Sequence, residues 1–119
     1  MLNLDTHILI YALGGRLRPR ESELLSAATW TISAIVLWEL AKLVQLGRLQ
    51  LDLDDRAVVR TLSGLQVWPI DLAVARVSKR LDFRGDPADE LIAATSIVHD
   101  VPLLTRDRRL RRSKVVPLA

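Results

Sequence analysis

The chain has 119 residues, of which 50% are hydrophobic and only 4% are aromatic. This length and apolar content predict a single folded domain, residues 1–119, and exclude an intrinsically disordered protein. There is no cysteine, which excludes disulfide scaffolds, cysteine-bound zinc, iron–sulfur clusters and thiol nucleophiles. The net charge is +3, and 14 of the 17 basic residues are arginine, the side chain best suited to bidentate phosphate binding.

Two features of the chain bear on where the protein works and what it binds. No apolar stretch reaches the roughly 18 residues that cross a membrane, and the first residues lack the basic segment of a signal peptide. We therefore expect a cytoplasmic protein without a membrane partner. Basic residues crowd the C-terminus around a single acid, Asp107, which on charge alone indicates either a solvated tail or a nucleic-acid contact. They are Arg106, Arg108, Arg109, Arg111, Arg112 and Lys114.

In the N-terminal half, short apolar runs and turn residues predict two strands and three helices. The strands cover residues 2–5 and 29–32, and the helices cover 7–13, 20–28 and 34–46. Ser33 is a good N-cap for the third helix. The polar residues of this helix are only Glu39, Lys42 and Gln45, so we expect it to be buried on several sides and to offer a partner surface.

The C-terminal half continues the alternation of strands and helices. Strands are predicted over 65–69, 103–105 and 115–117, and helices over 54–62, 72–81 and from Pro87 to a stop at Val101-Pro102. Asp86 takes the N-cap position of the last helix and Pro87 its first position, a typical start. The alternation predicts an α/β fold, a three-layer α/β/α sandwich around a mainly parallel central sheet.

Four carboxylates follow the predicted strands where a parallel sheet forms its sites, beyond the carboxyl ends of the strands. Asp5 ends the first strand, and Asp107 lies two residues past the strand 103–105. Glu39 is on the helix after the second strand, and Asp89 is in the first turn of the helix that begins at Pro87. We expect each element to deliver one acid to the same edge of the sheet.

Each acid alone has a structural explanation, such as an ion pair of Glu39 with Lys42 or a capping pair of Asp86 and Asp89. Together they repel one another, since two unit charges ~6 Å apart at an effective dielectric constant of ~20 do so by ~3 kcal/mol. A converged quartet therefore needs a cation, raised pKa values or arginine neighbours. Oxygen ligands without histidine or cysteine favour Mg²⁺ or Mn²⁺, and such sites activate water for phosphodiester hydrolysis.

The same acids fall in four short blocks that, taken in order, resemble the PIN-domain ribonucleases, and specifically the VapC-like toxins of toxin–antitoxin pairs. Each block is weak alone, but the ordered set is specific and spans nearly the whole chain. The blocks are Leu4–Ile10, Ile32–Leu40, Asp86–Thr95 and Leu103–Asp107.

The resemblance implies an α/β/α sandwich and an endoribonuclease that depends on Mg²⁺ or Mn²⁺. It assigns metal binding and catalysis to Asp5, Glu39, Asp89 and Asp107. It also implies an RNA substrate, a cognate antitoxin that blocks the site, and a homodimer, for which the apolar helix 34–46 offers a surface. The chain departs from the family at Glu90, where arginine is frequent, and at Arg106, where asparagine is also common. Asp86 therefore stays open as an alternative third ligand, although its position favours a helix cap.

Residues next to the acids are candidates for supporting roles. The hydroxyl groups of Thr6, Ser33 and Thr105 could orient a carboxylate or a metal-bound water, as could the carboxylate of Asp86. Capping explains Ser33 equally well, and strand propensity explains Thr105. The arginines beside Asp107 are placed to hold the RNA backbone, a contact that positions the strand without reading its sequence. These are Arg106, Arg108 and Arg109.

The sequence leaves three functional hypotheses. The first is a metal-dependent endoribonuclease that acts as the toxin of a toxin–antitoxin pair. The second is a PIN-like module that binds RNA or protein without cutting, with its acids serving as caps or ion pairs. The third is a receiver- or phosphatase-like domain with Asp5 as phosphoacceptor. It ranks last, because no lysine comes directly after Leu104 and Asn3 is the only other polar residue of the first strand.

Overall fold

The central sheet has four parallel strands in the spatial order β3-β2-β1-β4. The structure, a computed structural model, describes residues 1–119. The strands are β1 (Leu2–Leu4), β2 (Trp30–Ser33), β3 (Gln66–Trp68) and β4 (Leu103–Leu104). Every connection between strands runs through helices, as parallel pairing requires, so all four strands end at the same edge of the sheet.

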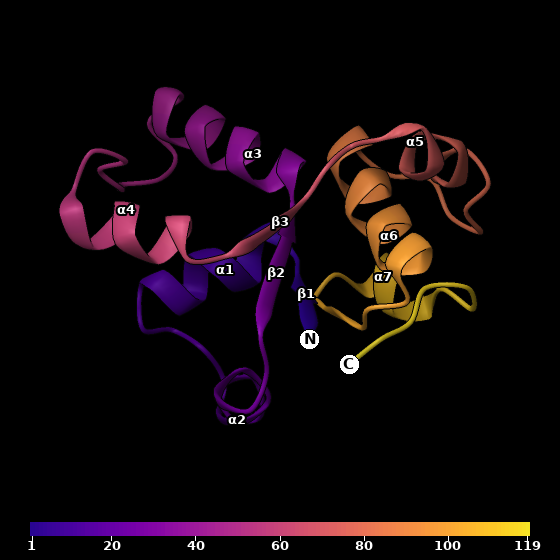
Figure 1. Cartoon of the computed structure of the whole chain (residues 1–119), viewed down its shortest axis with the longest axis horizontal. Coiled ribbons are helices and arrows are strands. Elements are labelled where there is room, and N and C mark those ends of the chain that lie inside the picture. The colour runs from indigo at the N-terminus through magenta and orange to yellow at the C-terminus, as the bar shows by residue number, and fades with distance from the viewer.

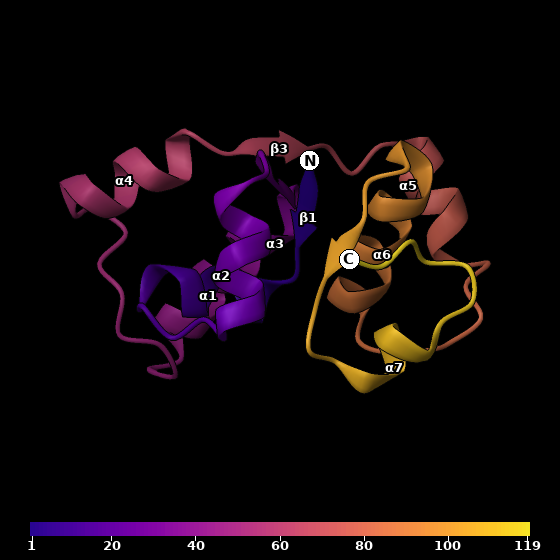
Figure 2. The same ribbon diagram turned by 90° about the horizontal axis from the view of Figure 1, so that it is seen from below.

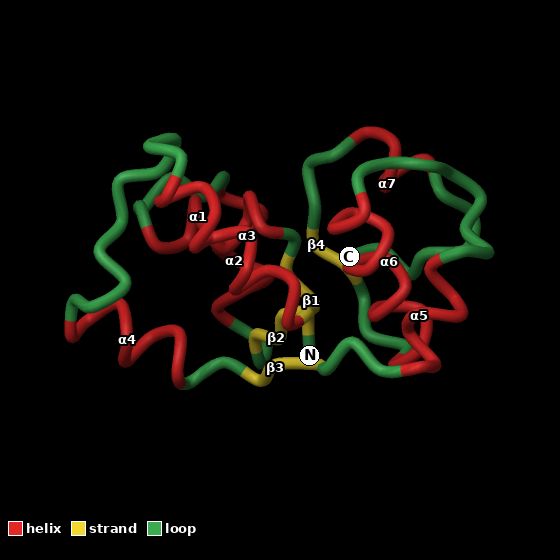
Figure 3. Tube along the Cα trace, turned by 90° about the horizontal axis from the view of Figure 1, so that it is seen from above, coloured by secondary structure: helices red, strands yellow, loops and turns green.

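Seven helices cover the two faces of this sheet. They are α1 (Thr6–Leu13), α2 (Pro19–Ser26), α3 (Ala34–Gln45), α4 (Arg56–Ser63), α5 (Leu72–Ser78), α6 (Pro87–His99) and α7 (Arg108–Arg112). Figure 1 shows α1 to α4 on one side of the strands and α5 to α7 on the other, and the views in Figure 2 and Figure 3 agree. The predicted three-layer α/β/α fold is therefore confirmed. None of these helices combines the length and the apolar composition needed to span a lipid bilayer.

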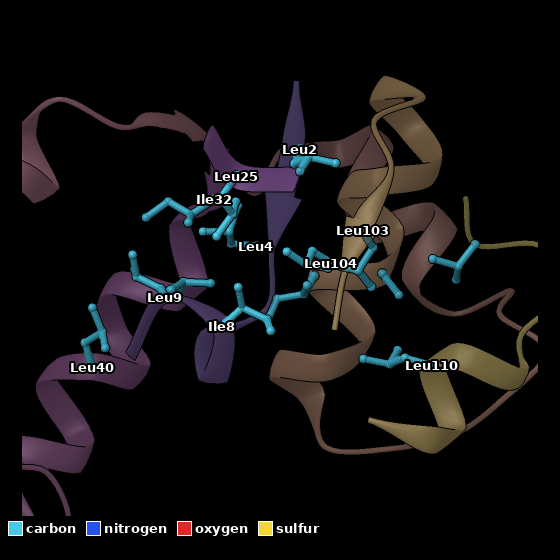
Figure 4. Close-up of a cluster of buried hydrophobic side chains, with 14 residues drawn as sticks. Leu2, Leu4, Ile8, Leu9, Leu25, Ile32, Leu40, Leu103, Leu104 and Leu110 are labelled. Atoms are coloured by element: carbon cyan, nitrogen blue, oxygen red, sulfur yellow. The ribbon is translucent and has the colours of Figure 1, made fainter. Parts of the chain in front are cut away.

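A cluster of aliphatic side chains fills the space between the sheet and both helical layers (Figure 4). All three residues of β1 are buried, because a central strand of a parallel sheet is covered on both faces. Leu4, Ile8 and Leu9 are fully buried and join β1 to α1. Full burial of one such side chain contributes about 1.5–3 kcal/mol. The cluster therefore holds firmly the end of β1, which Asp5 directly follows.

One polar side chain inside this core ties α6 to the sheet. Asn3 of β1 is fully buried, and its Nδ2 donates to the backbone oxygen of Ile92 at 3.2 Å and to Oγ of Ser96 at 2.9 Å. Both partners are on α6, so these bonds set how far the helix lies along the strand. Asp89 is one turn before Ile92, and Asn3 thereby positions that acid. An asparagine between two leucines of a buried strand is the sequence signal for this role.

The C-terminal segment differs from two of its sequence predictions, the tail and the final strand, while the nucleic-acid contact stays a prediction. The arginine-rich stretch is the helix α7, with Leu110 fully buried, and not a solvated tail. The strand predicted over 115–117 is wrong, because pairing there is reduced to a single parallel bridge between Leu118 and Leu103. One apolar residue among four arginines is too weak a periodic pattern to predict a helix.

The apolar helix α3 is buried on one side only. Val36 and Leu40 face the core, whereas Leu37 is 37% exposed and Trp38 is 58% exposed. The prediction that this helix is buried on several sides is therefore wrong for the single chain. The outer face of α3 leaves an apolar surface of the kind that marks interaction sites.

A largely buried ion pair fastens α2 to the end of β4. Arg106 lies two residues after the end of β4. Its Nη2 lies 2.6 Å from Oε1 of Glu21 on α2. The same guanidinium lies 4.0 Å from the centre of the Tyr11 ring on α1. The hydrogen bonds from Arg106 lower the pKa of Glu21 to about 2, against the opposing effect of burial. Arg106 therefore joins three elements of the fold.

We predict that Glu21→Gln destabilises the protein by about 2 kcal/mol at pH 7, because Arg106 then loses its charged partner. The folded pKa of about 2 lies below the ordinary value of 4.5, so this contribution is complete above pH 4.5 and is lost as the pH falls towards 2. Urea unfolding of both proteins between pH 7 and pH 3 measures the difference. It should shrink below pH 4.5, and a difference that stays constant with pH would contradict the prediction.

Candidate active site

The register of β1 and β4 brings Asp5 against Thr105. Leu4 pairs with Leu104, so the next residue of each strand meets its neighbour at the carboxyl edge of the sheet. Asp5 is 2% exposed, and its Oδ2 accepts a hydrogen bond from the Thr105 hydroxyl at 2.6 Å. Its Oδ1 accepts from the N–H of Thr6 at 2.8 Å. These two bonds hold the carboxylate of Asp5 in one orientation.

Glu39 approaches the same edge from α3. The Thr6 hydroxyl donates a hydrogen bond to Oε1 of Glu39, so Thr6 contacts two of the acids. Lys42, the alternative ion-pair partner, instead donates to Oε1 of Gln45 at 3.0 Å. Burial raises the pKa of Glu39; the hydrogen bond from Thr6 opposes this, and the charge of Asp5 adds to it. Glu39 is thus held among acids and not beside a lysine.

Asp89 and Asp107 share one cation, Arg109. Asp89 lies in the first turn of α6, and Asp107 caps α7 by accepting the N–H of Arg109 at 2.8 Å. Nη2 of Arg109 lies 3.6 Å from Oδ2 of Asp89 and 3.8 Å from Oδ2 of Asp107. Nη1 of the same side chain donates to the backbone oxygen of Arg84 at 3.2 Å. The Arg109 side chain is 52% exposed, so this bridge is open to water and to competing ions.

The negative charge of this cluster exceeds its positive charge. Burial raises the pKa of Asp89 from 3.8 to about 6, and the charges of the surrounding acids add to the effect. Those acids, in order of decreasing effect, are Asp5, Asp107, Glu39 and Asp86. They come from four separate segments of the chain and act on one carboxyl group. A single arginine does not balance them.

Hydrogen bonds and ion pairs connect the four predicted acids. The connection runs from Glu39 through Thr6 to Asp5, through Thr105 to Asp107, and through Arg109 to Asp89. Thr105 lies at its centre, since its Oγ1 donates to Asp5 and accepts the N–H of Asp107 at 3.0 Å. No three acid or histidine side chains converge closely enough to hold a metal ion together in this arrangement. By chemistry the donors fit Mg²⁺ or Mn²⁺, because all are carboxylate oxygens with uncompensated charge.

Two of the predicted supporting residues have other environments. Ser33 caps α3, its Oγ accepting from the N–H of Ile35 at 3.4 Å, and it makes no hydrogen bond to an acid. Asp86 takes the N-cap position of α6, but its carboxylate makes no capping hydrogen bond. The capping pair of Asp86 and Asp89 is therefore wrong. The charge of Asp86 instead acts on Asp89 and Glu39.

The three arginines predicted at the RNA backbone lie in different environments. Arg106 is committed to its ion pair with Glu21, so the prediction that it binds phosphate is corrected. Arg109 bridges two of the acids and is free only if it releases them. Arg108 is exposed and forms no ion pair. The arginines close to Asp107 in the sequence therefore have different partners in the structure.

The fold is a parallel α/β/α sandwich, and linked acids lie at the carboxyl edge of its sheet. Residues 3–115 match the family model of the PIN domain, so the chain belongs to the PIN-domain family. The resemblance to VapC-like PIN domains, inferred from four sequence blocks, is confirmed by the comparisons.

Relatives named VapC or found in toxin–antitoxin complexes are among the matches. The chain is 35% identical over 115 residues to Ribonuclease VapC22 of Mycobacterium tuberculosis, covering 91% of this chain and 88% of that protein. A chain in the crystal structure of VapBC2 from Rickettsia felis bound to promoter DNA has the same fold, with a TM-score of 0.74, 22% identity and coverage of 100% and 98%. A chain in a toxin–antitoxin complex from Klebsiella pneumoniae gives a TM-score of 0.69, 21% identity and coverage of 94% and 91%.

We predict that Asp89→Asn stabilises the metal-free protein by about 1–2 kcal/mol at pH 7. The folded pKa of about 6 lies above the ordinary 3.8, so the folded state binds this proton more tightly, and stability falls as the pH rises from about 4 to about 6. The asparagine does not titrate, so the gain should vanish near pH 4. Urea unfolding in EDTA at both pH values measures it, and equal stabilities at pH 7 would argue against the prediction.

Proposed function

We propose that the protein is a metal-dependent endoribonuclease that acts as the toxin of a toxin–antitoxin pair, with residues 1–119 as one PIN-like domain. The observation that carries this proposal is the group of acids around Asp89, whose raised pKa marks negative charge that one arginine does not balance. A divalent cation would complete that balance. Membership of the PIN-domain family and the identity to a protein named as a ribonuclease support an activity on RNA.

The residues of the site have separate roles in this proposal. The metal ligands for Mg²⁺ or Mn²⁺ would be Asp5, Glu39, Asp89 and Asp107. When bound, such an ion supplies an activated water and neutralises charge on the phosphodiester. Thr6 and Thr105 keep the acids oriented through their hydrogen bonds. Arg109 would release its two acids on metal binding and so become free, with Arg108, to contact the substrate phosphate.

Two protein partners belong to the same proposal. The first is a cognate antitoxin that blocks the site, which is supported by the fold shared with a chain of a toxin–antitoxin complex. The second is another copy of the chain, packed against the outer face of α3. Leu37 and Trp38 leave apolar surface there that a homodimer would bury.

We predict that Asp5→Asn lowers metal-dependent RNA cleavage by about 100-fold or more while the fold stays intact. Asp5 lies nearly buried among the acids, and asparagine keeps its shape while removing the charge. The measurement uses purified protein, freed of any copurifying partner, with total RNA in the presence and absence of Mg²⁺ or Mn²⁺. Glu23→Gln is the matched control, since it makes the same chemical change on the exposed surface of α2.

The expected result is metal-dependent fragments from the wild type and from Glu23→Gln, and none from Asp5→Asn. Cleavage retained by Asp5→Asn would overturn the assignment of that ligand. An alternative function is favoured if neither the wild type nor either variant cleaves RNA and if Asp5→Asn leaves the RNA affinity unchanged. That alternative is a non-catalytic RNA- or protein-binding PIN-like module.

We predict that Trp38→Glu weakens the proposed homodimer by about 30-fold or more, because buried tryptophans are frequent hot spots of interfaces. Sedimentation equilibrium of wild type and variant gives the two dissociation constants. Gln50→Glu changes the charge by the same amount at an exposed position outside α3 and should leave the dimer intact. A Trp38→Glu protein that dimerises as tightly as the wild type would place the interface elsewhere.

A further inference from the structure

A polar pocket at the β4 edge of the sheet lies beside the acids but contains none of the proposed metal ligands. Its volume is about 420 Å³, within the roughly 300–1,000 Å³ of ordinary ligand pockets. Leu104 is the only hydrophobic residue in its lining. The remaining residues come from the start of α2, from the segment that directly follows β4 and from α7. They are Arg18, Arg20, Glu21, Thr105, Arg106 and Arg111.

The pocket carries an excess of positive charge. Glu21 and Arg106 neutralise each other through their 2.6 Å ion pair. The other three arginines have no carboxylate partner, since none of them takes part in an ion pair. They are Arg18, Arg20 and Arg111. Three unpaired guanidinium groups around one cavity repel one another, and an anion between them would relieve that repulsion.

The type of anion follows from the geometry of arginine. The planar guanidinium presents paired donors that match two oxygens of one phosphate, and such charge-assisted bonds are stronger than neutral ones. No aromatic side chain lines the pocket, and the nearby Tyr11 ring is covered by Arg106. The pocket therefore has no aromatic ring on which a base could stack. Its chemistry suits a phosphate group and not a nucleobase.

The position of the pocket links it to the acids through Thr105. The backbone oxygen of Thr105 accepts a hydrogen bond from Nη1 of Arg111 at 3.2 Å, and its hydroxyl donates to Asp5 at 2.6 Å. Arg109, two residues earlier on α7, reaches the acids instead. One short helix thus presents one arginine to the acid cluster and another to the pocket. Thr105 therefore lies between the acid cluster and the pocket.

We propose that this pocket binds a backbone phosphate of the RNA substrate adjacent to the phosphate that is cut. The inference rests on the proposed function, because it takes the acids as the place of cleavage. The acid cluster repels a polyanion, and the pocket supplies attraction beside it. Since the pocket touches the backbone alone, it positions the RNA without selecting a sequence. Arg18 and Arg20, far from the basic C-terminus in the sequence, become substrate-binding residues.

The test compares Arg18→Gln/Arg20→Gln with Arg56→Gln/Arg60→Gln, which removes the same charge from the exposed helix α4. Both pairs are made in Asp5→Asn protein, so that fluorescently labelled single-stranded RNA is bound without being cut. Anisotropy at several NaCl concentrations gives Kd. The pocket pair should raise Kd by about 10-fold at low salt and reduce the slope of log K against log salt by about 0.7 for each phosphate that the variant no longer binds. The α4 pair should leave that slope unchanged.

Melting temperatures of both double variants should lie close to that of the parent, because Arg18 and Arg20 are exposed and form no ion pair. Arg18→Lys/Arg20→Lys retains the charge without the paired donors and should restore only part of the affinity. Equal losses of RNA affinity for the pocket pair and the α4 pair, or no loss for either, would overturn the proposal that the pocket binds a phosphate. A parent protein that binds no RNA would overturn the proposed function as well, so the two failures are distinguishable.

Discussion

The parallel pairing of β1 with β4 is the constraint on which the candidate site depends. Leu4 opposite Leu104 sets Asp5 against Thr105, and Thr105 carries the connection on to Asp107. The remaining acids arrive on helices docked to these strands, α6 through the buried amide of Asn3 and α3 through the hydroxyl of Thr6. Because side chains alternate along a strand, a slip of one residue in β1 would turn the side chains of Asn3 and Asp5 to the opposite faces. The hydrophobic residues on either side of them prevent that slip.

Gathering acids in this way lowers the stability of the metal-free chain. The raised pKa of Asp89 and of Glu39 records that loss, and Arg109 offsets only part of it from a half-exposed position. The fold compensates elsewhere, with the aliphatic core and with the ion pair of Glu21 and Arg106. Groups that are unfavourable in the resting protein are characteristic of sites shaped for a ligand. The structure thus separates residues that stabilise the fold, such as Glu21 and Arg106, from acids that lower its stability.

The sequence predicted the alternation of strands and helices, and with it the edge at which Asp5, Glu39, Asp89 and Asp107 gather, because hydrophobic periodicity and capping act locally. It did not predict α7, whose one buried leucine gives no periodic signal. Nor did it separate the arginines: Arg106 turns to Glu21, 85 positions away, while Arg109 turns to Asp89. The three-dimensional fold sets the ion-pair partner of a long flexible side chain, and the spacing of residues along the chain does not reveal that partner. The buried Asn3 was visible as a polar residue in an apolar strand, but its partners on α6 were not.

The hydrogen bond between Asp5 and Thr105 joins residues 100 positions apart. During synthesis β1 leaves the ribosome well before β4, so the pairing of these two strands forms only after the helices and strands between them have been made. Such distant pairing must overcome the entropy of closing a long loop and is a slow event in folding. A nascent chain that still lacks Thr105 and Asp107 cannot contain the full set of acids. For a protein proposed to destroy RNA, this order of assembly postpones its activity until residues 105–107 have been synthesised.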